Sequence, residues 1–299
     1  MNGEILEFLK VNDVEYEENL SLRKISAVKI GSEAYLVAYP DSITKFVLLT
    51  DFLENKKTKY KILGRMSNVL PPDEYYDGVI VRSDKACHYN IKGREIIAES
   101  GISLPKLASV AMRHSLSGLE ALGGIPGSLG GAIYQNAGAF GRTISDVIVG
   151  VTAYDVERRS IFGLTKSDCS FGYRESVFNS RKYVILNAKI SLTQGRVDEI
   201  KALAESYYQR RRETQPINMP SLGSVFKITG SGISAAQLID ECGLKGVRVG
   251  GASVSQKHAG FIVNDGFATS RDYLTLIEIV REKVKDRFGI ELECEIEML

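Results

Sequence analysis

The sequence has few cysteines, only three histidines, almost no net charge and no long apolar run. Its four cysteines, at positions 87, 169, 242 and 294, never form a CxxC or CxxxC spacing, so neither a zinc site nor a redox pair is predicted. The 38 Lys and Arg residues balance 37 Asp and Glu residues to a net charge of +1. No global field therefore recruits nucleic acid or an anionic membrane.

The chain also lacks features of secreted and membrane proteins. No window approaches the ~20 apolar residues that a membrane span requires. The first residues, MNGEILEFLKVNDVEYEEN, are acidic and periodic, whereas a signal peptide has a basic start and an apolar run. The scattered cysteines fit buried thiols in a reducing compartment. We therefore expect a cytoplasmic protein.

Length and composition indicate an ordinary globular chain. The hydrophobic share of 44% and the charged share of 25% exclude a disordered or collagen-like protein. A length of 299 residues predicts about two domains.

Glycine is concentrated in one segment. Eight of the 24 residues from Gly118 to Gly141 are glycine, in GLEALGGIPGSLGGAIYQNAGAFG. Interleaved Leu, Ile, Tyr and Phe residues argue against a flexible linker. Such density indicates unusual backbone conformations or a close approach to a flat or phosphorylated ligand, although a series of tight turns also explains it.

Short strands and helices alternate around this segment. Apolar periodicity predicts strands at Ala34–Tyr39, Tyr60–Leu63, Gly78–Arg82, Glu95–Ala98, Val147–Val156, Tyr183–Leu192, Ser224–Ile228 and Gly260–Asn264. It predicts helices at Ser42–Leu53, Leu104–His114, Val197–Arg212, Ser234–Cys242 and Ser270–Arg287. Two prolines at 216 and 220 indicate a domain boundary nearby.

Three further motifs carry polar side chains, each with two interpretations. The Gly64–Asn68 turn (GRMSN) could hold a pyrophosphate on its backbone amides or simply connect two strands. In FGYRES, Arg174 could fork onto a substrate carboxylate or pair with Glu175 on the surface. In the closing IELECEIEM, an edge strand would place four glutamates on one face, and the alternation singles out none of them.

Two kinds of catalytic site are not supported by the sequence. Ser224, in GSVFK, has no GxSxG elbow around it, so a hydrolase nucleophile is not predicted. The histidines at 88, 114 and 258 are widely spaced, and no metal site is predicted.

The order of these motifs along the chain identifies a protein family more specifically than any single motif does. The Gly64–Asn68 turn, the glycine-rich segment, FGYRES, RETQP, GSVFK, GLKG, GGASVSQKHAGFIVN and LECEI together resemble the UDP-N-acetylenolpyruvoylglucosamine reductase (MurB) family. The resemblance runs from about residue 20 to the end. Without a long insertion after Leu192, the chain is similar to the shorter type, which lacks an additional tyrosine-bearing loop.

The resemblance implies an α+β fold with two domains. A split FAD-binding domain of the vanillyl-alcohol-oxidase (PCMH) type would occupy residues 1–195, with subdomains at about 1–85 and 86–195. A MurB-type substrate domain would occupy residues 196–299. NADPH would reduce non-covalent FAD, which would reduce UDP-N-acetylglucosamine enolpyruvate to UDP-N-acetylmuramate in peptidoglycan synthesis. We expect a monomer that binds neither nucleic acid nor a membrane.

The resemblance also assigns residues. Arg174 would stabilise the enolate-like charge, assisted by Glu295, and Ser224 would deliver a proton. Substrate or NADPH contacts are expected from Arg212, Gln215 and Lys227. Cofactor contacts are expected from Gly64, Ser67, Asn68, Gly124, Ile125, Pro126, Gly127, Ser128, Gly130, Gly131, Gln135, Asn136 and Gly138.

The sequence departs from the family pattern at two motifs. Met66 replaces the second glycine of the G-x-G-S-N turn, and Ile228-Thr229 replaces the Asn-Pro that usually follows the lysine of GSxFK. Two alternatives follow. One is another PCMH-type flavoprotein oxidoreductase, and the other is a non-catalytic MurB-like protein that binds flavin or nucleotide.

Overall fold

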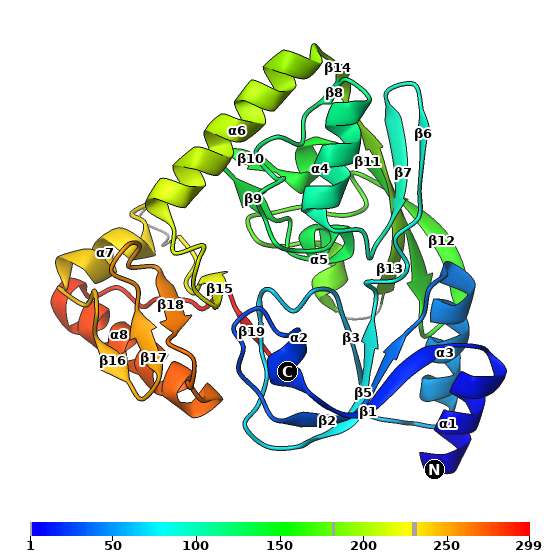
Figure 1. The fold of residues 1–299 in the computed structure, drawn as a ribbon, viewed down its shortest axis with the longest axis horizontal. Coiled ribbons are helices and arrows are strands. Elements are labelled where there is room, and N and C mark those ends of the chain that lie inside the picture. Colours follow the sequence, from blue (N-terminus) through cyan, green and yellow to red (C-terminus); the bar gives the residue numbers. More distant parts are fainter. Residues whose placement is uncertain (1, 181–182, 229–231) are drawn as a thin grey trace. The chain divides into compact units, whose positions relative to one another are not determined.

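The computed structural model describes residues 2–180, 183–228 and 232–299. The chain packs into two compact units, each built from three separate segments (Figure 1). The first unit contains Met1–Glu18, Leu36–Arg65 and Asp77–Gln209, and the second contains Asn19–Tyr35, Met66–Tyr76 and Arg210–Leu299.

The first unit holds two larger sheets, two two-stranded sheets and most of the described helices. Elements that lie wholly or mostly in it are α1 (Asn2–Val11), β1 (Glu15–Ser21), β2 (Glu33–Tyr39), α3 (Ile43–Asn55), β3 (Tyr60–Leu63), β5 (Tyr76–Arg82), β6 (Tyr89–Lys92), β7 (Glu95–Glu99), α4 (Leu104–Arg113), β8 (Leu116–Ser117), α5 (Leu129–Tyr134), β9 (Gly138–Ala139), β10 (Arg142–Thr143), η1 (Ile144–Asp146), β11 (Ile148–Asp155), β12 (Ser160–Thr165), η2 (Val177–Ser180), β13 (Tyr183–Ser191), β14 (Thr193–Gln194) and α6 (Val197–Thr214). One of the larger sheets has the order β1-β2-β5-β3, with β3 parallel to β5. The other larger sheet has the order β12-β11-β13-β7-β6, with antiparallel neighbours.

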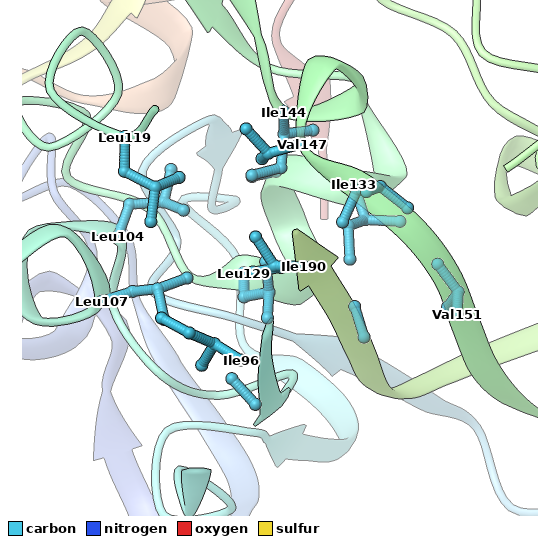
Figure 2. Close-up of a cluster of buried hydrophobic side chains, with 14 of the residues drawn as sticks. Ile96, Leu104, Leu107, Leu119, Leu129, Ile133, Ile144, Val147, Val151 and Ile190 are labelled. Carbon is cyan, nitrogen blue, oxygen red and sulfur yellow. The ribbon is translucent and has the colours of Figure 1, made fainter. Parts of the chain in front are cut away.

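The main core of the first unit lies against the second of these sheets. β13 alternates, so that its even-numbered side chains from Val184 to Ile190 are buried. α4 begins after Ser103, whose hydroxyl accepts from the Lys106 amide, and it buries one apolar stripe. Figure 2 shows Leu104 and Leu107 of α4 beside Leu129 of α5 and the sheet residues. The glycine-rich segment therefore contributes to a packed core and is no linker.

The second unit is built around a smaller sheet. Its elements are α2 (Leu22–Ile25), β4 (Val69–Leu70), β15 (Ser221–Ser224), α7 (Ala235–Glu241), β16 (Arg248–Val249), β17 (Ala252–Val254), β18 (Phe261–Asn264), α8 (Ser270–Phe288) and β19 (Glu297–Met298). The sheet order is β15-β18-β17-β16, and β19 pairs in parallel with β4. α7 and α8 bury their apolar side chains with this sheet.

Early segments of the chain complete the second unit. Val28, Ile30 and Leu70 are fully buried in its core, although they precede the rest of it by more than a hundred residues. Asn264 is 1% exposed, and its amide donates to the carbonyl oxygens of Val28 (2.9 Å) and Lys29 (3.2 Å). Its own Oδ1 accepts from two backbone amides of the following loop.

The start of α8 is held in the same way. The Asp73 carboxylate accepts from the amides of Ser270 (2.7 Å) and Arg271 (2.9 Å), which are donors without partners inside the helix. Packing thus groups two N-terminal segments with the C-terminal part, whereas the sequence analysis expected contiguous domains. Which functions residues 1–195 and 196–299 carry stays a prediction.

Most predicted elements are confirmed within a residue or two, but two are wrong. The strand expected at Ser224–Ile228 ends at Ser224, because Gly223 has φ +79° and the register shifts there. The long C-terminal edge strand is reduced to Glu297–Met298 and an isolated bridge between Phe226 and Cys294. Among the described helices, none combines the length and apolar character needed to cross a membrane.

Candidate functional site

The glycine-rich segment forms an accessible loop that leads into a short helix. Gly124, Ile125 and Gly127 are half-exposed and Pro126 is exposed, before Ser128 caps α5. The Ser128 hydroxyl accepts from the Gly131 amide at 3.3 Å. Gln135 ends α5, and its amide donates to the Gly131 carbonyl oxygen at 3.3 Å. The loop thus leaves backbone accessible to a ligand while its ends are fixed.

Close packing explains two of the glycines. A Cβ on Gly64 would overlap the Ser128 hydroxyl oxygen, and a Cβ on Gly130 would come within 2.9 Å of the Ser100 Cβ. Ser100 and Ser128 are both buried. The turn after β3 therefore packs directly against the start of α5, and the groups at this contact are serine hydroxyls and glycine backbone. This donor-rich, side-chain-poor junction fits the anionic pyrophosphate of a dinucleotide cofactor.

The turn accommodates Met66 by adopting a left-handed conformation. Met66 has φ +50°, which costs a non-glycine residue about 1–2 kcal/mol. Its side chain is only 2% exposed, and its carbonyl oxygen accepts from the Ala27 amide at 3.2 Å. The backbone therefore keeps a glycine-like conformation, and the methionine side chain is buried in the second unit.

Asn68 and Glu295 lie together in the second unit. The Asn68 amide donates to the Glu295 carbonyl oxygen at 3.0 Å, and the Glu297 amide donates back to the Asn68 carbonyl oxygen at 2.9 Å. Ser67 and Asn68 are half-buried. Gly64 and Arg65 are assigned to the first unit and Met66, Ser67 and Asn68 to the second, so the chain passes from one unit to the other within this segment.

Ser224 and Glu295 are joined by a short backbone pairing. The Glu295 amide donates to the Val225 carbonyl oxygen at 2.8 Å, and the Lys227 amide donates to that of Glu293 at 2.9 Å. The Lys227 ammonium also forms an ion pair with the Glu293 carboxylate. The Ser224 hydroxyl donates to the Phe226 carbonyl oxygen at 3.2 Å. Two predicted catalytic residues and one predicted substrate contact are thus brought together.

Burial divides the four glutamates of the closing segment into two pairs. Glu291 and Glu293 are exposed, whereas Glu295, next to buried Ile296, and Glu297 are half-buried. Burial, which the alternation pattern could not reveal, therefore does not by itself single out Glu295.

Arg174 occupies a tight turn in the first unit. The Gly172 amide donates to the Glu175 carbonyl oxygen at 2.9 Å, and Arg174 has φ +56° between them. Its guanidinium lies 5.4 Å from the centre of the Tyr173 ring and 3.5 Å from the Gly138 carbonyl oxygen. The turn and these contacts hold the arginine, and its guanidinium is a group that can bind a carboxylate with two hydrogen bonds.

Asn136 lies behind this turn. It is 6% exposed, donates to the Gly172 carbonyl oxygen at 2.8 Å and accepts from the Ser145 amide at 3.2 Å. Gly138 pairs with Thr143 in the β9–β10 hairpin, where an added Cβ would crowd the Arg142 carbonyl. The segment after α5 thus supports the Arg174 turn from two sides.

The remaining predicted substrate contacts lie at the end of α6. The Arg212 carbonyl oxygen accepts from the Lys257 ammonium at 2.6 Å. The Gln215 Oε1 atom is buried without a hydrogen-bond partner among the described residues, an acceptor for which a ligand donor would compensate. Burial lowers the pKa of the neighbouring Arg211 guanidinium below its ordinary value. Ile228 is exposed, and Thr229 lies outside the described residues.

The sequence analysis did not predict several polar residues that lie near the predicted cofactor and substrate contacts. Ser83 and Ser100 are buried beside Gly64 and Gly130, and isolated serines give no pattern. Lys257 and His258 line a pocket of about 410 Å³ with α7. Burial, with a smaller contribution from Lys245, lowers the pKa of His258. The motif SQKHAG was the available signal for these two residues.

Within the residues that the structure describes, no group of three or more His, Cys, Asp or Glu side chains is arranged to hold a metal ion.

Comparisons with known proteins agree over most of the chain. The family described as "FAD binding domain" matches residues 34–158, and "UDP-N-acetylenolpyruvoylglucosamine reductase, C-terminal domain" matches residues 215–299. A UDP-N-acetylenolpyruvoylglucosamine reductase of Caldanaerobacter subterraneus subsp. tengcongensis is 41% identical over 94% of this chain and 92% of its own. That of Pseudothermotoga lettingae is 43% identical, covering 93% and 95%.

A solved structure is similar over nearly its whole length. The crystal structure of UDP-N-acetylenolpyruvylglucosamine reductase (MurB) from Thermus caldophilus superposes with a TM-score of 0.79 at 30% identity, covering 95% of this chain and 98% of that one.

Proposed function

The chain belongs to the UDP-N-acetylenolpyruvoylglucosamine reductase family and is an FAD-dependent oxidoreductase, and on this premise we propose the reaction and the residues that carry it. The substrate is UDP-N-acetylglucosamine enolpyruvate, the product is UDP-N-acetylmuramate, and NADPH is the electron donor. The observation that carries the proposal is the pairing of the Ser224 and Glu295 segments beside Lys227. The reaction belongs to cytoplasmic peptidoglycan synthesis.

Arg174 stabilises the charge that develops during reduction. A flavin bound there would supply the hydride, taken from NADPH, that the vinyl carbon of the substrate needs. Negative charge then accumulates on the enolate beside the substrate carboxylate, and a preorganised cation lowers the energy of that state. Arg174 suits this role because its turn fixes it and because a guanidinium can bind a carboxylate with two hydrogen bonds.

Ser224 donates the proton that completes the reduction. In the structure the Ser224 hydroxyl donates to the Phe226 carbonyl oxygen. In the proposed step the hydroxyl rotates and donates its proton to the enolate carbon that did not receive the hydride. A new C–H bond forms there, the Ser224 O–H bond breaks, and solvent later restores the serine proton. Glu295, on the paired segment, assists Arg174 in stabilising the enolate-like charge.

Two groups of residues bind the reactants. Gly64, Ser67, Asn68 and the 124–138 segment hold the cofactor, supported by their bare backbone and hydroxyls. Arg212, Gln215 and Lys227 contact the anionic substrate or NADPH, and the unpartnered Gln215 oxygen accepts from an N–H or O–H group of the ligand. Residues 1–195 accordingly bind FAD and residues 196–299 bind substrate, and the protein acts as a monomer without nucleic acid or membrane.

The decisive experiment follows NADPH oxidation by the flavin-loaded protein under anaerobic conditions, with and without UDP-N-acetylglucosamine enolpyruvate. We expect multiple turnovers only with this substrate. Peroxide formation from another alcohol or sugar in air would favour a PCMH-type oxidase instead, and failure to bind flavin would favour a non-catalytic binding protein.

A serine variant tests the proposed proton donor. Ser224→Ala should slow substrate reduction at least 100-fold while flavin reduction by NADPH stays within 3-fold of the unsubstituted protein, since only the later step needs the proton. Ser206→Ala is the matched control, because its hydroxyl also donates to a backbone carbonyl oxygen but lies on exposed α6. Normal turnover by Ser224→Ala would remove this residue from the mechanism.

A further inference from the structure

Both polar atoms of the Asn136 side chain are engaged by the protein backbone. Its Nδ2 donates to the Gly172 carbonyl oxygen, and its Oδ1 accepts from the Ser145 amide. A carbonyl oxygen on one side and an N–H on the other fix the orientation of the amide group. The side chain is also 6% exposed, so it faces protein rather than a ligand site.

The bond to Gly172 holds the turn that carries Arg174. Gly172 begins this turn, and its amide pairs with the Glu175 carbonyl oxygen. Arg174 sits two residues later at φ +56°, a conformation that persists only when surrounding contacts enforce it. Asn136 itself has φ +44°, so the residue that donates to Gly172 and the arginine two residues beyond Gly172 both have a left-handed backbone.

We propose, on the basis of the proposed reduction, that Asn136 is a positioning residue for Arg174: its buried amide fixes the Gly172–Glu175 turn and thereby sets where the guanidinium lies. The resemblance had placed Asn136 among the cofactor contacts. In this proposal it acts on the substrate half of the reaction, through Arg174, and leaves flavin binding to its exposed neighbours.

The substitution that tests this is Asn136→Asp. An ionised aspartate keeps the size of the side chain and can still accept from Ser145, but it places a second acceptor against the Gly172 oxygen. At pH 8 we expect substrate reduction to slow 10- to 100-fold while flavin affinity and flavin reduction by NADPH change less than 3-fold. The rate relative to the unsubstituted protein should rise as pH falls towards 5, because a protonated aspartate can donate to Gly172.

Two further variants control for damage to the fold. Asn12→Asp makes the same change at an amide that also donates to a backbone carbonyl oxygen, that of Phe8 at 2.9 Å, and it should leave all rates unchanged. If Asn136→Asp does not fold, Asn136→Gly replaces it, since glycine adopts φ +44° readily and lacks the amide.

A double-mutant cycle identifies the path of the effect. In the Arg174→Lys background, Asn136→Asp should cause less than 3-fold further loss, because the guanidinium it would position is already absent. Independent, multiplicative losses would overturn the proposal. So would a raised flavin dissociation constant with a normal substrate step at saturating flavin, which would return Asn136 to the cofactor contacts.

An NMR measurement separates this proposal from the proposed reaction. The Arg174 side-chain Nε–H signal, assigned by its loss in Arg174→Lys, should shift in Asn136→Asp and stay in place in Asn12→Asp. An unshifted signal overturns the positioning role, whether or not the enolpyruvyl substrate is reduced. Absence of substrate reduction by the unsubstituted protein overturns the proposed reaction alone.

Discussion

Arg174 and Ser224 are held in place by different means in their respective units. Arg174 lies in a four-residue turn with a left-handed backbone, and one buried side chain, Asn136, holds the turn. Ser224 lies at the end of a strand, and backbone hydrogen bonds join its segment to that of Glu295. The comparison teaches that one buried side chain holds the Arg174 turn, whereas pairing between segments distant in sequence holds the Ser224 segment.

The largest expected effect comes from separating those distant segments. Asn264→Ala removes an almost fully buried amide that holds Val28 and Lys29 to the second unit. Four hydrogen bonds are lost and buried backbone groups remain unsatisfied, so we expect the free energy of unfolding to fall by about 4 kcal/mol. Urea denaturation measures this. Asn12→Ala, at a part-buried amide, should cost less than about 1 kcal/mol, and equal losses would contradict the special role of Asn264.

The corresponding test of the first unit uses its close packing. Gly64→Ala drives a methyl group into the Ser128 hydroxyl, and we expect about 2–3 kcal/mol of destabilisation together with weaker flavin binding. Calorimetry and flavin titration would measure both.

A second substitution makes this test specific. Ser128→Ala alone should cost about 1 kcal/mol, because it removes the cap of α5. In the Gly64→Ala background it should instead restore stability, since the clashing oxygen is gone. Additive losses in the double variant would show that the two loops do not pack as described.

Met66 offers a smaller test. Met66→Gly relieves about 1–2 kcal/mol of left-handed strain but removes a buried side chain that contributes about 2–3 kcal/mol. We expect a net loss of about 1 kcal/mol in thermal unfolding. Lys57→Gly is the control: Lys57 has φ +51° and an exposed side chain, so the same change should be neutral or stabilising. Stabilisation by Met66→Gly would mean that its side chain contributes little to packing.

The smallest expected effect concerns pH. Hydrogen bonds from the Thr269 backbone amide first, then from the Gly251 amide and the Thr269 side chain, lower the pKa of Asp272 below its ordinary value. Because the folded pKa lies below the unfolded one, this stabilisation is present above about pH 4 and is lost as pH falls through the folded pKa. In Asp272→Asn the free energy of unfolding should fall less steeply as the pH is lowered from 5 to 2. An unchanged pH dependence of the free energy of unfolding would show that Asp272 does not contribute to it.

Local patterns in the sequence predicted much of the fold. β3 at Tyr60–Leu63 was predicted to the residue, and the helix expected at Ser270–Arg287 matches α8 to within one residue. These signals depend on neighbouring residues alone.

What the sequence could not predict depends on contacts between distant residues. Nothing local indicates that Val28 and Leu70 belong to the core of the second unit, or that Asn136 is buried behind Gly172. The alternation in the C-terminal segment predicted a longer strand than the structure has, because β19 pairs with β4, which is two residues long. Arg174, Ser224 and Glu295 were assigned by family resemblance, and their roles remain proposals.

The composition of the second unit has a consequence for synthesis of the chain. Asn19–Tyr35 and Met66–Tyr76 leave the ribosome well before Arg210–Leu299 are made, so Val28, Ile30 and Leu70 have no core to enter during most of translation. The first unit is complete by Gln209, but these apolar residues must wait until Ile296 has emerged. During that interval the nascent chain presents them to chaperones or to other chains.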